Sequence, residues 1–185
     1  MKLCSWVNLN CKEYIDYHNF EWGVPSFDDD YLFEMLILES FQAGLNWETI
    51  LKKRKYFKIA YDDFNVKKVS LYNDLKIKEL MSNKNIIRNK LKIESSINNA
   101  KIFIKIKEEW GSFSNYIWHF TNGKIVYGCM QTENELSKII SQDLKLRGMK
   151  FVGSVIIYSY LQAIGIINDH EKECFKYEED LCIKD

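Results

Sequence analysis

Apolar residues recur along the chain at intervals of three and four, the spacing that gathers them on one face of an α-helix. The clearest stretch runs from about Asp28 to Ala43. Three aspartates stand at its start, where they suit the helix dipole, and Gly44 follows as a stop signal. Asn46 can cap the next helix, WETILKKRKYFKIAY. The same periodicity predicts further helices at Leu75–Met81, Lys90–Glu109, Glu133–Lys145 and Val155–Ile164.

Strand signals are weak, and KIVYG at 124–128 is the only strand-like piece. GSF at 111–113 and NGK at 122–124 are typical of turns, and most of 21–30 and 121–132 is expected to be loop. The chain holds one proline and eight glycines, and 46% of its residues are hydrophobic. This composition favours long helices. We therefore predict an all-α fold and a single domain over residues 1–185.

Charge is balanced over the whole chain but not along it. Residues 1–50 hold two basic and nine acidic residues, whereas 51–107 hold sixteen basic and five acidic. Residues 108–185 hold eight basic and twelve acidic. The middle third, with a net charge of +11, is a candidate phosphate-binding face. A lysine-rich helix surface that only faces solvent is the alternative.

No apolar run is long enough to span a membrane, and the N-terminus is too polar for a signal peptide. We therefore expect a cytoplasmic protein. In that compartment the five cysteines are expected to be free thiols or metal ligands rather than disulfides.

Cysteine and histidine are paired near both ends of the chain. Cys4 and His18 stand near the N-terminus, and His170 and Cys174 are four residues apart near the C-terminus. On a helix, that last spacing lets a thiolate and an imidazole grip one ion, and two such pairs suit tetrahedral zinc. The alternative explanation is that the spacing arises by chance and that the cysteines are simply buried apolar residues. Cys11 and Cys182 are possible competing ligands. Cys129 and His119 lack a partner pattern and are interpreted as structural.

Glu39 is unusual because it lies on the apolar side of its predicted helix. Its neighbours at helical spacing are Leu32, Met35, Leu36, Gln42 and Ala43. A buried acid usually has a partner or a task, so a salt bridge is the ordinary explanation and a binding role the other. Aromatic residues crowd the same part of the chain, and with one acid they could receive a flat cationic ring. They are Trp6, Tyr14, Tyr17, Phe20, Trp22 and Trp47.

Several stretches together resemble one family, DNA-3-methyladenine glycosylase I, of the helix-hairpin-helix DNA glycosylases. Between residues 4 and 174, in family order, they are CSW at 4–6, YHNFEWGVP at 17–25, LFEMLILESFQAGLNWETILKKR at 32–54, NIIRNKLKI at 85–93, LRGMKFVG at 146–153 and NDHEKEC at 168–174. ESFQAGLNW is the most specific of these.

The resemblance implies an all-α, bilobed fold whose ends are joined by one structural zinc. It assigns the metal to Cys4, His18, His170 and Cys174, which sets the other cysteines aside. It makes Glu39 the acid that reads the base, in a pocket lined by Trp6, Tyr14, Tyr17, Trp22 and Trp47. It also implies a hairpin that binds a DNA phosphate, comprising Lys84, Asn85, Ile86, Ile87, Arg88, Asn89 and Lys90. Its backbone amides and the lysines 84, 90 and 92 are expected to hold phosphates.

The implied activity is hydrolysis of the N-glycosidic bond of 3-methyladenine in double-stranded DNA, which releases the free base and leaves an abasic site. Trp47 would stack on the flipped base, Glu39 would accept from its amine, and Tyr17 would add a hydrogen bond. No general-base aspartate is implied, and KFVGSVIIYSY at 150–160 contains no acid. We expect a monomer.

Some positions depart from the family. Asn85 stands where some relatives have glycine, the 122–140 segment looks short, and 175–185 matches nothing and is expected to be a mobile tail. The sequence is also compatible with two alternative functions. One is a non-catalytic DNA- or RNA-binding module, and the other is a zinc protein that binds a modified nucleoside without DNA.

Overall fold

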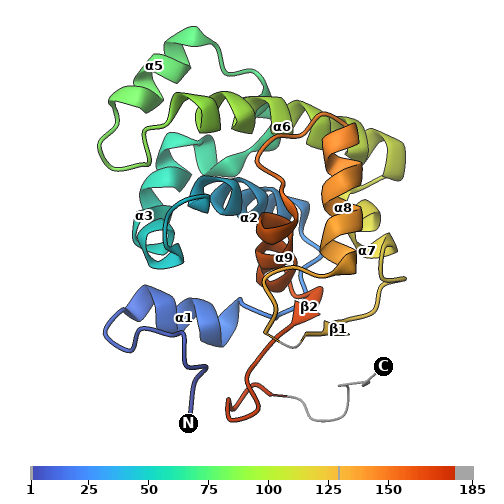
Figure 1. Ribbon diagram of the computed structural model, residues 1–185. Coiled ribbons are helices and arrows are strands. Elements are labelled where there is room, and N and C mark those ends of the chain that lie inside the picture. The colour runs from blue at the N-terminus through green and yellow to red at the C-terminus, as the bar shows by residue number, and fades with distance from the viewer. Residues whose placement is uncertain (1, 129, 178–185) are drawn as a thin grey trace.

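The computed structural model describes residues 2–128 and 130–177, and this part of the chain is mostly helical (Figure 1). The helices are α1 (Lys12–Phe20), α2 (Asp29–Gln42), α3 (Trp47–Ala60), the 3-10 turn η1 (Asp62–Phe64), α4 (Val66–Ser70), α5 (Asp74–Ser82), α6 (Lys90–Trp110), α7 (Phe113–His119), α8 (Glu135–Leu146) and α9 (Ser154–Ala163). The strands β1 (Val126–Tyr127) and β2 (Ile167–Asn168) form one short parallel pair. None of the described helices is long and apolar enough to cross a membrane.

Helix α2 forms the centre of the molecule and packs against α3, α6, α7 and α9 (Figure 1). Every residue from Leu32 to Phe41 is buried, so the helix has no solvent face beyond its first turn. The Asp28 carboxylate caps it by accepting from the Asp30 N–H. Glu39 is therefore carried into the interior by the position of its helix and not only by its place on an apolar face.

Most helices predicted from periodicity are confirmed within one or two residues, and Asn46 caps α3 as expected by accepting from the Thr49 N–H. The turn predicted at 111–113 is only half right. Gly111, with φ of 79°, ends α6, but α7 begins at Phe113. The Asp29 carboxylate on α2 accepts from the Phe113 and Ser114 N–H groups. Ser112 also caps α7 locally by accepting from the Asn115 N–H over 2.9 Å, so the start of this helix has both a local and a distant cap.

The N-terminal segment and the last described residues lie side by side at the lower edge of the molecule, where the Phe175 N–H donates to the Lys2 carbonyl (Figure 1). The Gly23 N–H donates to the Gln162 carbonyl, and the Ser26 N–H donates to the Ile164 carbonyl. A Cβ on Gly165 would lie 2.2 Å from the Val24 backbone, so only glycine fits this crossing. This contact holds the loop after α1 against the end of α9 and brings Cys/His pairs from both termini together.

Two predicted features fall outside the described residues, wholly or in part. Cys129 and Cys182 lie outside them, and so does most of the tail expected at 175–185, of which only 175–177 are described. His119, interpreted as structural, is the last residue of α7 and stacks on Trp110 with ring centroids 4.3 Å apart.

Candidate functional site: an aromatic pocket beside a Cys/His cluster

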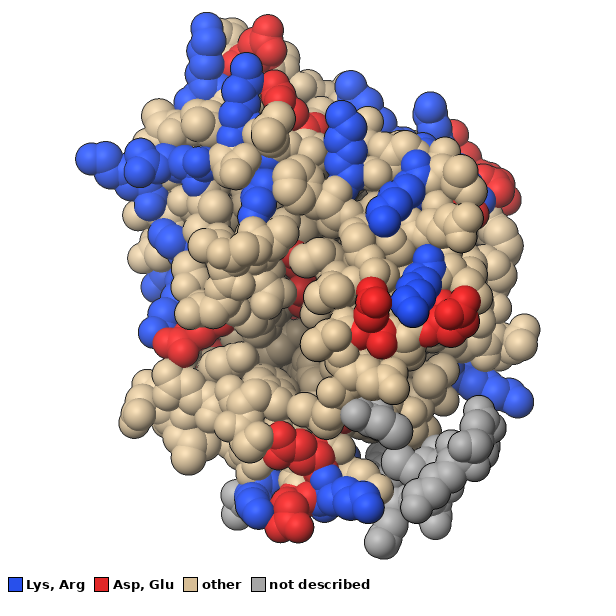
Figure 2. Space-filling model, in the orientation of Figure 1, with Lys and Arg blue, Asp and Glu red and all other residues tan. Residues whose placement is uncertain are grey.

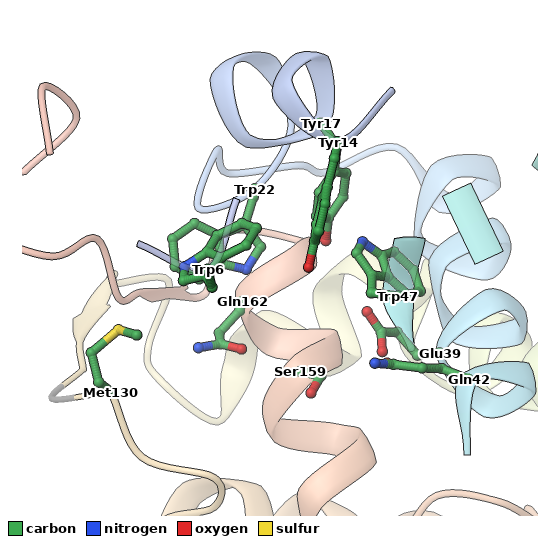
Figure 3. A pocket seen from close by; sticks show the side chains of 10 residues that line it. All are labelled: Trp6, Tyr14, Tyr17, Trp22, Glu39, Gln42, Trp47, Met130, Ser159 and Gln162. Carbon is green, nitrogen blue, oxygen red and sulfur yellow. The ribbon is translucent and has the colours of Figure 1, made fainter. Parts of the chain in front are cut away.

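A small pocket of about 210 Å³ opens among α1, α2, α3 and α9 (Figure 3). Its volume suits one ring system more than an extended ligand. All six residues that the sequence assigned to a base pocket line it: Trp6, Tyr14, Tyr17, Trp22, Glu39 and Trp47. Four further lining residues were not assigned there from sequence: Gln42, Met130, Ser159 and Gln162.

Glu39 and Trp47, which both line this pocket, carry the two fully buried side-chain polar atoms of the described residues that have no hydrogen-bond partner. The Glu39 side chain is 2% exposed, and among the described residues its Oε2 has no hydrogen-bond partner. The same holds for Nε1 of Trp47, which is 8% exposed. Burial raises the pKa of Glu39 well above its ordinary value. An acceptor and a donor kept unpaired in one cavity are suited to groups on a ligand, because buried polar atoms are otherwise almost always paired.

The aromatic side chains form the walls of the pocket. The Trp6 and Trp22 rings meet edge to face at 4.7 Å, and the Tyr17 and Trp47 rings lie tilted at 5.3 Å. Tyr14 packs on Trp6 at 5.3 Å. Rings locked against one another keep the cavity open without a ligand, and their faces attract a flat, positively charged ring.

The lining residues missed from sequence differ in how they could have been found. Ser159 and Gln162 are three residues apart on α9, which is otherwise largely apolar, so both fall on one helix face. That spacing is a usable signal. Gln42 stands out in the sequence only as a neighbour of Glu39 at helical spacing, and Met130 lies in a loop with no periodic pattern.

A second cluster lies directly behind the pocket wall and unites the Cys/His pairs of both chain ends. The ligand atoms of Cys4, His18, His170 and Cys174 are buried and all lie within 4.8 Å of one another. Cys4 Sγ is 3.5 Å from His170 Nδ1, and Cys174 Sγ is 3.4 Å from His18 Nε2. A tetrahedral ion with bonds of about 2.0–2.3 Å holds its ligand atoms about 3.3–3.8 Å apart. The cluster therefore has the dimensions to bind a metal.

The surroundings of the cluster favour metal-binding forms of the two histidines. His18 Nδ1 lies 2.8 Å from Asn19 Oδ1, which directs Nε2 toward the thiols. Burial lowers the pKa of His18 and lowers that of His170 to about 4, so both rings are neutral and can ligate. Burial also raises the pKa of the Cys4 thiol to about 12, an effect that a bound cation would reverse.

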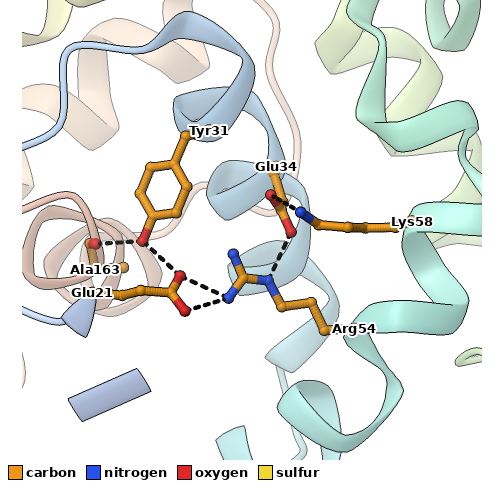
Figure 4. Close-up of polar contacts among 6 residues, drawn as sticks. All are labelled: Glu21, Tyr31, Glu34, Arg54, Lys58 and Ala163. Atoms are coloured by element: carbon orange, nitrogen blue, oxygen red, sulfur yellow. Dashed lines mark hydrogen bonds and ion pairs between the residues drawn. The ribbon is translucent and has the colours of Figure 1, made fainter. Parts of the chain in front are cut away.

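Arg54 is the centre of an ion network that connects α2, α3 and the segment before Trp22 (Figure 4). Arg54 on α3 donates from Nη1 to both Glu21 oxygens, over 2.8 and 2.7 Å, and from Nε to Glu34 over 2.7 Å. Tyr31 donates to Glu21 and to the Ala163 carbonyl, each over 3.2 Å. Glu21 precedes Trp22, and Ala163 follows Gln162, so the network joins four of the segments that carry pocket residues.

The predicted hairpin at 83–90 comprises the loop between α5 and α6 and Lys90, the first residue of α6. Ile86 is buried and anchors it, while Lys84, Asn85, Arg88, Asn89 and Lys90 are exposed. The Asn85 carbonyl accepts from Lys53 of α3 over 3.0 Å. Lys and Arg side chains gather on this side of the molecule, above the hollow in the middle of the face (Figure 2).

Lys92 does not fit the role expected of it. Its side chain is 6% exposed, and its Nζ donates to the Phe41 carbonyl over 2.8 Å and to the Ala43 carbonyl over 2.5 Å. It therefore satisfies the carbonyl groups at the end of α2, near Glu39 and Gln42. The expectation that Lys92 holds a phosphate is wrong, because its donors are engaged inside the protein.

A second hairpin joins α8 to α9 over residues 147–153. Met149 and Val152 are buried, while Lys145 and Lys150 are exposed on either side of the turn. Gly148 has a φ of 94°, and Gly153 at the start of α9 provides no side-chain cap. The N–H groups of the first turn of α9 thus remain available to an acceptor.

Comparison with known proteins identifies the family that the chain resembles. A family model described as methyladenine glycosylase matches residues 6–177. A DNA-3-methyladenine glycosylase of Haemophilus influenzae is 38% identical over 177 residues, covering 92% of this chain and 95% of the relative.

Solved structures agree in the same way. A crystal structure of 3-methyladenine DNA glycosylase I gives a TM-score of 0.92 at 36% identity, covering 96% of this chain and all of that one. A variant of such a glycosylase solved in complex with 3-methyladenine gives a TM-score of 0.89 at 36% identity, covering 94% of this chain and 96% of that one.

The fold and the pocket therefore define an enzyme of the glycosylase class, which hydrolyses N-glycosyl bonds. Within that class, the chain belongs to the methyladenine glycosylase family.

Proposed function

We propose that this protein excises 3-methyladenine from double-stranded DNA, releasing the free base and leaving an abasic site. The observation that carries the proposal is the unpaired Glu39 carboxyl oxygen inside an aromatic pocket of the size of one base. The relatives are glycosylases of this specificity, and one of them was solved with 3-methyladenine bound. Release of free base from methylated duplex DNA tests the proposal, with unmethylated duplex as the control.

Glu39 and the aromatic rings would recognise the base by charge and shape. Methylation at N3 makes the adenine of the nucleotide cationic, so a carboxylate is its natural partner. A cation in the pocket would offset the burial that raises the pKa of Glu39, and the ionised carboxylate would then accept from the exocyclic amine. Trp47 offers its ring face for stacking, and Tyr17 a hydroxyl. Normal adenine lacks the charge and costs more to unstack from the duplex.

Bond cleavage needs little more than this binding. The methylated base leaves with the bonding electrons as a neutral molecule, and water supplies the oxygen that replaces it at the sugar. Holding the flipped nucleotide in the right geometry would supply much of the acceleration. None of the ten residues lining the described pocket is a lysine, and Glu39 is its one carboxylate. This supports a monofunctional glycosylase that forms no covalent intermediate with the DNA.

Two hairpins would hold the DNA backbone. The loop at 83–90 offers exposed Lys84, Arg88 and Lys90. The loop at 147–153 offers the uncapped start of α9, with Lys150 beside it. Backbone N–H groups and lysines bind phosphates without reading sequence. A protein that must find a rare lesion needs contacts of this kind.

The Cys/His cluster would bind one zinc ion as a structural staple. Two thiolates and two imidazoles are a preferred zinc ligand set, and a closed shell of four leaves no position for substrate. Bound zinc would tie Cys4 and His18 to His170 and Cys174 and so hold the Trp6 and Trp22 walls in place. We also propose a single bilobed domain that acts as a monomer.

A nucleoside-binding protein that does not act on DNA is the second candidate, because the pocket alone would suit free modified bases. The exposed hairpin lysines favour DNA. Salt-dependent binding to duplex DNA separates the two candidates, since neutralised phosphates release counterions.

A further inference from the structure

Gln162 on α9 points into the base pocket, and a buried carboxylate behind it fixes its amide. Its Nε2 donates to Asp169 Oδ2 over 2.8 Å. A carboxylate only accepts hydrogen bonds, so the amide nitrogen must face Asp169 and the carbonyl oxygen must face away from it. Figure 3 shows that oxygen turned toward the interior of the pocket, across from Glu39. The pocket therefore presents a second acceptor on the wall opposite the first.

Asp169 is held in place by donors on three sides. It is 2% exposed, and besides Gln162 it accepts from the Tyr158 hydroxyl over 2.8 Å and from the Met130 N–H over 2.6 Å. A Cβ on Gly128 would come within 2.6 Å of Asp169 Oδ1, so glycine there makes room for the carboxylate. Asp169 cannot turn without breaking these bonds. The orientation of Gln162 is therefore set before any base arrives.

We propose that Gln162 is a specificity-determining residue that reads the exocyclic amine of the base, and that Asp169 is the positioning residue that makes Gln162 an acceptor. The inference rests on the proposed function and adds a preference to it. Two acceptors on opposite walls suit a base that carries an amine. A base with an oxo oxygen at that position meets oxygen lone pairs on both sides and is rejected.

The test compares free 3-methyladenine with 3-methylhypoxanthine, which has an oxygen in place of the exocyclic amine. Affinities are measured by quenching of tryptophan fluorescence, since three tryptophans line the pocket. Gln162→Met keeps the size of the side chain and removes the acceptor. It should weaken 3-methyladenine binding roughly three- to tenfold and leave 3-methylhypoxanthine binding unchanged or stronger. Gln142→Met, on the exposed surface of α8, is the matched control and should change neither affinity.

Asp169→Asn probes the positioning role. The new amide can donate to the Gln162 oxygen, which lets the Gln162 nitrogen turn toward the pocket as a donor. The affinity for 3-methyladenine relative to that for 3-methylhypoxanthine should then fall further than it does in Gln162→Met. Because Asp169 precedes His170, the metal content and melting temperature of Asp169→Asn are measured as well. If Asp169→Asn has lost its metal, the inference is judged on Gln162→Met alone.

Equal weakening of both bases in Gln162→Met, or no change in their ratio, would overturn the inference, because a residue that only fills space cannot tell amine from oxygen. A wild-type protein that releases no 3-methyladenine from methylated DNA would instead overturn the proposed function. Base release by the wild type with an unchanged ratio in Gln162→Met sinks the Gln162 inference alone.

Discussion

The aromatic pocket and the Cys/His cluster share a wall, but their polar atoms are arranged in opposite ways. Trp22 lines the pocket and packs edge-on against His170 of the cluster, with ring centroids 4.6 Å apart. In the cluster, the four ligand atoms face one another within 4.8 Å. In the pocket, Glu39 and Trp47 each keep one atom without a partner among the described residues. Polar atoms that face one another can bind a metal and stabilise the fold, whereas unpaired buried polar atoms are suited to contacts with a ligand.

The largest effect should follow from breaking the cluster. We expect Cys174→Ala to lose the metal and to lower the melting temperature by more than about 10 °C, because metal binding contributes directly to the free energy of folding. Elemental analysis and thermal unfolding check this. Cys11→Ala is the control, since Cys11 is equally buried but lies outside the cluster, and it should cost only about 1 kcal/mol. Full zinc occupancy in a Cys174→Ala, His170→Ala double variant would contradict the ligand assignment.

The pocket should respond in the reverse way, with function lost and the fold retained. Glu39→Gln keeps the shape, removes the charge and presents donors to the base's amine. We expect affinity for free 3-methyladenine to fall roughly ten- to a hundredfold, as for a lost charge-assisted contact of about 1.5–3 kcal/mol. Titration by fluorescence measures it. Unchanged affinity would mean that Glu39 does not read the base.

The same helix offers a matched control for this variant. Glu34 is also buried on α2, but it is paired with Arg54 and Lys58. Glu34→Gln should destabilise the fold, because it weakens a paired and buried network. It should change the affinity for 3-methyladenine much less than Glu39→Gln does. Two buried acids on one helix thus separate a bracing role from a binding role.

Stability should depend on pH through Glu39 in a direction that its burial fixes. The folded protein holds the Glu39 proton at pH values where the unfolded chain, with a pKa of 4.5, has lost it. The stability contributed by the protonated acid is therefore present in full below the unfolded pKa and is lost as pH rises through the raised folded pKa. Glu39→Gln should consequently melt several degrees above wild type at about pH 8, and the gap should narrow toward about pH 4.5. A gap that stays constant with pH would show that Glu39 is not the titrating group.

The sequence predicted features that depend on neighbouring residues better than features that depend on contacts between distant segments. Glu39 stands out on an apolar helix face, whereas the full set of four cluster ligands followed only from the family resemblance. His170 and Cys174 were paired on a helical spacing, but they lie in the loop and turns after β2 and not in a helix. The sequence did not indicate the role proposed for Gln162, because that role depends on its hydrogen bond to Asp169. The two side chains meet only when the segment after β2 folds back against α9. Lys92 was misjudged for a similar reason. Its carbonyl partners lie about fifty residues away, at the end of α2. A count of charged residues along the sequence carries no information about such partners.

The comparison between polar groups bonded inside the protein and polar groups free to bind a ligand also applies to the basic middle third, in which Lys92 is bonded inside the protein. Lys92→Met should leave the Phe41 and Ala43 carbonyl groups buried without a donor, which costs about 1–3 kcal/mol. We expect a lower melting temperature and an unchanged salt dependence of DNA binding. A variant that is fully stable but binds DNA with a shallower salt slope would restore Lys92 to the phosphate face.

Lys84 should give the smallest effect and the opposite pattern. It is exposed at the tip of the α5–α6 hairpin, and removing an exposed lysine there should change folding stability by less than about 0.5 kcal/mol. If Lys84 contacts a phosphate, Lys84→Ala weakens binding to damaged and undamaged duplex alike and flattens the slope of log K against log salt by about one unit at most. Lys78→Ala, in α5 outside the hairpin, is the comparison. Should Lys84→Ala keep the wild-type slope while Lys150→Ala flattens it, the α8–α9 hairpin and not the α5–α6 hairpin holds the phosphate. The contrast between engaged and free polar groups would then still hold, because Lys150 is exposed as Lys84 is, and only the choice of hairpin would change.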